Sequence, residues 1–152
     1  MNIAIGRRYW RFAVVLPTVL VRPMATSLSV SGSPANMIIT TAVAGQPPTA
    51  VTDATTTYTI VATGATKRGV TGKLNTALPA GVTLTVTMAA CGGGASYGPI
   101  VLTTVAQDLV HGITTSGSGC TAAITYQLNA TAAAGVVALV TKTVTLAEVA
   151  LP

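Results

Sequence analysis

The chain has 152 residues, of which half are hydrophobic and only 7% carry a charge. This balance excludes a chain that stays disordered through low hydrophobicity and high net charge. Three acidic residues and one histidine leave almost no material for proton transfer or metal binding. We therefore predict one folded domain that is not an enzyme and that uses no metal or cofactor. Thr is the most frequent residue, with 27 copies, which is typical of strands with a solvent-facing side.

The formal net charge of +5 is concentrated at the N-terminus. Four of the eight basic residues lie before residue 25, at Arg7, Arg8, Arg11 and Arg22. The remaining four basic residues minus three acidic ones give a net charge of +1 for the rest of the chain. Because binding to phosphates needs clustered positive charge, we expect no nucleic-acid partner. A net charge near zero also weakens the repulsion that keeps copies apart.

The first 27 residues have the pattern of a secretory signal peptide. A basic segment is followed by an apolar stretch over residues 12–21, and small residues at Ala25 and Ser27 form a candidate cleavage site. The apolar stretch is too short to span a bilayer, which needs about 20 residues. We expect a secreted protein, with residues 28–152 as the mature domain. The alternative is that residues 1–27 are retained as an N-terminal arm.

From residue 26 onward, apolar and hydroxyl side chains alternate. In residues 81–88, Val82, Leu84, Val86 and Met88 share one face and three threonines share the other. This period of two predicts strands with one buried face. The predicted strands are 26–31, 36–43, 57–62, 68–74, 81–88, 99–105, 109–113, 124–128 and 136–146.

These short strands are separated by turn sequences rich in Gly, Pro and Ser, and no helical stretch interrupts them. The pattern predicts an all-β fold, an antiparallel β-sandwich of immunoglobulin-like or pilin-like type with about seven to nine strands. Residues 28–152 are expected to form this single domain, and an extended N-terminal strand is expected over residues 26–40.

Cys91 and Cys120 are the only cysteines. In a secreted protein such a pair predicts one disulfide rather than a metal site. Cys91 follows one predicted strand and Cys120 begins another, so the bond is expected to join two neighbouring strand ends. Two reduced, buried thiols are the alternative if the chain is not exported.

Two groups of residues are candidates for chemistry or ligand binding. Asp108 and His111, with a hydroxyl from Ser96, Ser116 or Ser118, allow a Ser-His-Asp arrangement to be written. The sequence lacks the spacing of a nucleophile elbow, however, and we assign no catalytic residue. Loops around Tyr97 and residues 116–119 are candidates for binding a glycan on a host or cell surface.

The layout of a leader, an alternating N-terminal segment and a Thr-rich, disulfide-bonded sandwich resembles bacterial fimbrial (pilin-like) subunits. In pilins that assemble by strand exchange, an extended segment of one subunit completes the sheet of the next. The resemblance implies a subunit-interface strand that contains Leu28, Val30, Met37 and Ile39. The chain differs from chaperone-assembled pilins in its late cysteines and in lacking a penultimate tyrosine.

The sequence thus predicts a structural subunit of an extracellular filament or surface assembly, whose partner is a second copy of itself. The alternative is a monomeric adhesin or carbohydrate-binding module.

Overall fold

The computed structural model describes residues 26–34, 36–40, 46–62, 66–115, 118–134 and 140–152. These ranges contain nine strands and one short 3₁₀ helix. The strands are β1 (Thr26–Ser31), β2 (Val51–Ala62), β3 (Arg68–Leu74), β4 (Val82–Met88), β5 (Ala95–Ser96), β6 (Ile100–Val101), β7 (Gln107–Ile113), β8 (Cys120–Ala130) and β9 (Val144–Ala150), and the helix η1 is Ala132–Ala134. The predicted leader lies outside the described residues.

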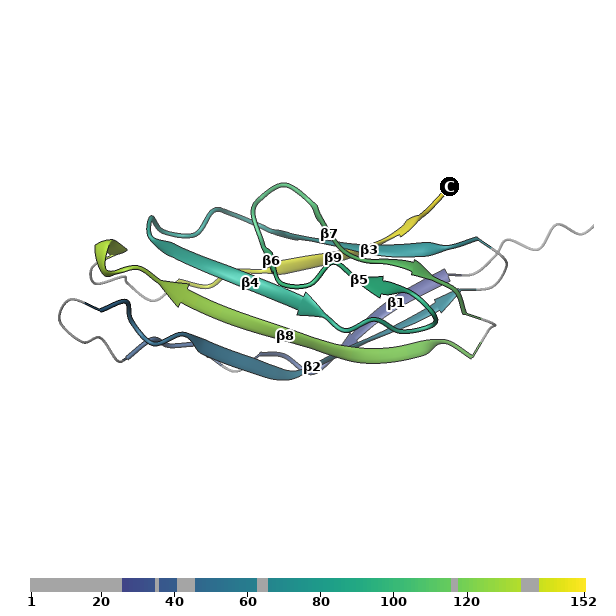
Figure 1. The fold of residues 1–152 in the computed structure, drawn as a ribbon, viewed down its shortest axis with the longest axis horizontal. Coiled ribbons are helices and arrows are strands. Elements are labelled where there is room, and N and C mark those ends of the chain that lie inside the picture. The colour runs from purple at the N-terminus through teal and green to yellow at the C-terminus, as the bar shows by residue number, and fades with distance from the viewer. Residues whose placement is uncertain (1–25, 35, 41–45, 63–65, 116–117, 135–139) are drawn as a thin grey trace, which may run out of the picture.

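The strands form two antiparallel sheets. Sheet A has the order β1-β2-β8-β4-β6, and sheet B has the order β5-β7-β3-β9. The strands run roughly along the long axis of the molecule, and the two sheets lie against each other (Figure 1). The predicted all-β, antiparallel sandwich is therefore confirmed.

The core lies between the sheets because the apolar phase of each long strand faces inward. In β4, for example, Leu84, Val86 and Met88 are buried while Thr83 is exposed. The same period places Tyr58 and Ile60 of β2 in the core. Sheet B contributes a further set of buried side chains: Val70, Leu74, Leu109, Val110 and Ile113. The alternation of Thr with apolar residues thus sorts each strand into a wet face and a dry face.

Three predicted strands differ from the structure. Residues 36–40 are not in a strand, and residues 41–43 lie outside the described residues. The segment predicted over 99–105 is a strand only at Ile100–Val101. In the segment predicted over 136–146, strand β9 begins at Val144, residues 140–143 are not in a strand, and residues 136–139 lie outside the described residues. In the first two segments, the apolar residues are compatible with a strand but have no neighbouring strand along their whole length. A strand forms only where its backbone pairs with another, whatever its composition.

The two long lateral sides of the sandwich differ. We call one the β1–β9 side, because the edge strands β1 and β9 lie near each other there across the layers. The other is the β5–β6 side, where the edges are two strands of two residues each. In the described part of the chain, the exposed large hydrophobic side chains belong to these edge strands or to segments that flank them. They are Val30 of β1, Val101 of β6, Tyr97 directly after β5, and Ile38, Val105 and Val140 in the segments that follow β1, follow β6 and precede β9.

Candidate subunit interface

Strand β1 contains two of the predicted interface residues and is attached to the body along one edge. It pairs antiparallel with β2 in an unbroken register from Thr26↔Ala62 to Ser31↔Thr57. Leu28 packs partly buried against the core, whereas Val30 is 47% exposed. Among the described strands β2 is the only one that pairs with β1, so the other edge of β1 offers free backbone groups.

The chain turns away from sheet A directly after β1. Gly32 has a φ of +83°, in the left-handed region that strongly favours glycine. A Cβ at this position would lie 2.9 Å from the carbonyl oxygen of Thr55. The left-handed conformation of Gly32 therefore marks the end of the strand at Ser31.

Residues 36–40 contain the other two predicted interface residues. Met37 packs partly buried against the core, and Ile39 is half-buried. Ile38 lies between them and is 53% exposed. The four predicted residues are therefore divided between a paired strand and an unpaired segment, both of which follow one another along the chain.

Strand β9 is the second edge strand of this side. It pairs with β3 from Arg68↔Ala150 to Leu74↔Val144 without a bulge. Val144 and Leu146 point toward the core but remain partly buried. Next along the same face, Glu148 accepts a hydrogen bond from Arg68 at 2.8 Å, and the two side chains are 16% and 13% exposed. The charge of β9 is therefore directed inward and neutralised.

Sequence reasoning missed this ion pair, although a signal was present. Glu148 continues the apolar phase of Val144 and Leu146, and Arg68 is in phase with Val70 and Leu74 of β3. Two opposite charges at core-facing positions of two strands suggest a pair. What the sequence did not contain was the information that these two strands are neighbours.

The disulfide between Cys91 and Cys120 is confirmed. Its Cα atoms are 5.9 Å apart, within the range that a disulfide normally spans. Cys91 follows β4 and Cys120 begins β8, and β4 and β8 are hydrogen-bonded neighbours in sheet A. The bond also fixes the start of the segment that crosses from β4 to β5 and so closes the β5–β6 side.

The structure does not assemble the Ser-His-Asp arrangement. The Oγ of Ser96 accepts a hydrogen bond from the backbone N–H of Gly98. The Nδ1 of His111 is buried without a partner among the described residues, and Asp108 is exposed on the same strand, β7. Ser118 is exposed, and Ser116 lies outside the described residues. Within the described ranges, no group of three His, Cys, Asp or Glu side chains could hold a metal ion.

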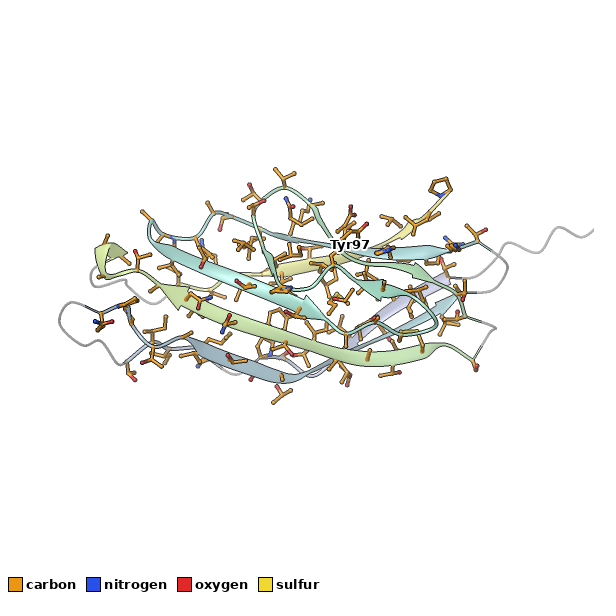
Figure 2. The ribbon with its side chains drawn as sticks, viewed as in Figure 1. Tyr97 is labelled. Atoms are coloured by element: carbon orange, nitrogen blue, oxygen red, sulfur yellow. A yellow bond between two sulfur atoms is a disulfide. The ribbon has the colours of Figure 1, made fainter. Side chains whose placement is uncertain are left out.

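The two parts of the candidate glycan site lie on different sheets. Tyr97 is half-exposed beside β7 of sheet B (Figure 2), and its ring centroid is 4.5 Å from that of His111. Gly119, in contrast, lies against β2 of sheet A, where a Cβ on it would be 3.1 Å from the carbonyl oxygen of Ile60. Residues 116 and 117 lie outside the described residues.

Two buried tyrosines carry the perturbed titrating groups. Burial raises the pKa of the Tyr58 phenol above its ordinary value of 10.0, and the phenol donates a hydrogen bond to the carbonyl of Ala89. Burial also raises the pKa of Tyr126, and the negative charge of Asp53 raises it further. Both tyrosines belong to sheet A, Tyr58 to β2 and Tyr126 to β8.

No family model, curated protein or solved structure matches the chain. No helix among the described residues has the length and hydrophobicity needed to cross a membrane.

Proposed function

We propose that this chain is the repeating structural subunit of an extracellular filament or surface assembly. Copies would join by β-strand addition, with residues 26–40 of one copy entering the sandwich of the next. Export is supported by the leader pattern and by the disulfide, because such bonds persist in oxidising compartments.

The observation that carries the proposal is the weak attachment of β1. Among the described strands, β1 pairs along one edge only, and it buries Leu28 only partly and leaves Val30 half-exposed. The bend at Gly32 follows it at once. A second copy can offer β1 the same partner, β2, in the same register, so exchange gains back the hydrogen bonds that it breaks. Exchange of an identical element is a low-cost route to assembly.

The exposed edge of β1, on the β1–β9 side, supports the same proposal. An exposed edge is normally protected by charge, proline, a bulge or short length. Strand β1 contains neither a charged residue nor a proline, and it pairs with β2 without a bulge. The exposed side chains of Val30 and Ile38 add apolar surface that association would cover.

The decisive experiment mixes two variants that each carry one added cysteine beside the native disulfide, Ser29→Cys and Thr59→Cys. These residues lie opposite each other in the β1–β2 register. If β1 of one copy pairs with β2 of another, oxidation of the mixture gives a disulfide-linked heterodimer. A chain that carries both substitutions should form the bond internally and reports correct folding. Thr85→Cys, on β4 of the same sheet, replaces Thr59→Cys in the control mixture and should not crosslink.

Electron microscopy of the secreted protein provides the second measurement. Filaments are expected from the wild type, and Val30→Asp with Ile39→Asp should abolish them, because a charge is costly to bury between subunits. Thr85→Asp is the matched control and should leave filaments intact. Isolated particles from the wild type, together with no crosslink in the Ser29→Cys and Thr59→Cys mixture, would refute the proposal.

A further inference from the structure

The free edge of β9 has a hydrogen-bonding pattern that can be derived from its neighbour β3. The N–H of Asn75 donates to the carbonyl of Thr143, and the N–H of Leu151 donates to the carbonyl of Lys67. Both bonds join residues that lie directly opposite each other in the β3–β9 register, which is unbroken between them. In an antiparallel pair, hydrogen-bonded and non-hydrogen-bonded positions alternate. The odd-numbered residues of β9 therefore bond to β3.

The even-numbered residues of β9 must then direct their N–H and C=O groups away from β3. These residues are Val144, Leu146, Glu148 and Ala150. No described strand pairs with this edge. The four residues lie symmetrically about Ala147, the central residue of the strand.

From this symmetry we infer that β9 pairs antiparallel with β9 of a second copy, about a twofold axis at Ala147. In that register Val144 lies opposite Ala150 of the other copy, and Leu146 lies opposite Glu148. Each such pair exchanges two hydrogen bonds, and the four pairs of this type give eight bonds, four times two, so every outward backbone group of both strands is used.

The side chains of β9 are compatible with this register and disfavour one alternative. At the axis, two small Ala147 side chains face each other on the outer surface, and Thr145 faces Val149 of the other copy. A shift of the axis to Glu148 would place two glutamates directly opposite, which destabilises a strand pair. If the axis passed through Leu146, only three of the four outward residues of each β9 would lie opposite a residue of the other β9. The inward ion pair of Glu148 with Arg68 leaves no net charge to repel a second copy.

A second copy of this chain is the partner for which β9 is self-complementary, and it brings the same partly buried Val144 and Leu146 to the seam. The pairing would join the two B sheets into one continuous eight-stranded sheet, since each contributes four strands. It is independent of the exchange of β1, which uses the edge of β2. In a filament it would connect two subunits at a contact other than the exchanged strand.

The test uses Ala147→Cys in the full chain under mild oxidation. Residue 147 occupies a non-hydrogen-bonded position of the new pair, where Cα atoms are about 4.5 Å apart, a distance that a disulfide spans. A covalent homodimer should form rapidly. Ala123→Cys is the matched control, since Ala123 is also an exposed alanine, on β8 of sheet A, and it should stay monomeric under the same oxidation.

Two further variants test whether the contact exists without the engineered bond. Ala147→Lys places two like charges at the axis and should weaken association. The protein concentration at which half of the chains are paired should rise at least about tenfold, and Ala123→Lys should leave it unchanged. Ala150→Pro removes an outward N–H, which an edge strand tolerates, and should weaken association while the unfolding midpoint is retained.

Equal crosslinking of Ala147→Cys and Ala123→Cys would overturn the inference, as would association that is unaffected by Ala147→Lys. Crosslinking of Ala147→Cys to an unrelated extended peptide in place of a second copy would also refute the twofold pairing. None of these results depends on Ser29→Cys or Thr59→Cys, so failure of the β9 contact and failure of β1 exchange can be told apart.

Discussion

The two lateral sides of the sandwich have opposite designs. On the β5–β6 side the edge strands have two residues each, and the chain crosses from sheet A to sheet B beside the Cys91–Cys120 disulfide. On the β1–β9 side the edge strands have six and seven residues, and no covalent bond fixes them. Short edges are a known protection against strand addition, and long uncharged edges invite it.

This contrast indicates where stability and association are located. The β5–β6 side buries Leu102 to 3% exposure and so completes the core. The β1–β9 side leaves Leu28, Val144 and Leu146 only partly buried. Both sides expose apolar side chains, so the difference lies in the backbone: one side closes the fold with short edge strands, while the other keeps two long strand edges available to a partner.

Removal of the disulfide should destabilise the β5–β6 side most. The chain-entropy model gives about 3.5 kcal/mol for a loop of this length, since the two cysteines have a sequence separation of 29. Cys91→Ala with Cys120→Ala should lower the free energy of unfolding by about that amount in urea titrations. Hydrogen exchange should increase first in β5 and β6. Faster exchange confined to β1 and β9 would contradict the division between the sides.

Truncation of one leucine on each side compares the two directly. Leu102→Ala should cost about 3 kcal/mol, because it removes a fully packed side chain and leaves a cavity. Leu28→Ala should cost about 1 kcal/mol, since Leu28 is only partly buried and its site can be filled by water. Both free energies come from the same urea titrations. Equal losses would show that β1 is as integral to the core as the segment after β6 that contains Leu102.

Tyr126 belongs to neither side and provides a reference in the middle of sheet A. Its phenol is neutral when folded and has a raised pKa, so the unfolded chain releases the proton first as the pH rises. The contribution of this phenol to stability should therefore be constant below about pH 10 and fall above it, by at most about 1.4 kcal/mol per pH unit. Tyr126→Phe should flatten the decline in urea titrations, and an unchanged decline would assign it to another group.

Several features were predictable from local sequence. The period of two in residues 81–88 reports which face of β4 is buried, because successive strand side chains point in opposite directions. The same argument located β1, β3 and the inner face of β8. The disulfide was predictable because two cysteines allow one pairing. Two of the candidate interface residues, Leu28 and Met37, pack partly buried against the core of their own chain, and their place at a subunit interface stays a prediction.

Other features depend on which segments meet in space. The alternation in β3 resembles that in β2 and β4, yet β3 pairs with β7 and β9 in sheet B while the other two belong to sheet A. Residues 36–40 have strand-forming side chains but no partner strand, whereas β5 forms from Ala95 and Ser96 because β7 lies beside them.

The sequence alone thus indicates an all-β chain with amphipathic strands, one possible disulfide and few residues suited to catalysis or metal binding. Tertiary structure decided the sheet order, the Arg68–Glu148 pair and the two unequal sides. The physical reason is that side-chain periodicity is a local property, whereas strand pairing depends on long-range contacts and register. Which edges remain open is known only after every other strand has found its neighbour.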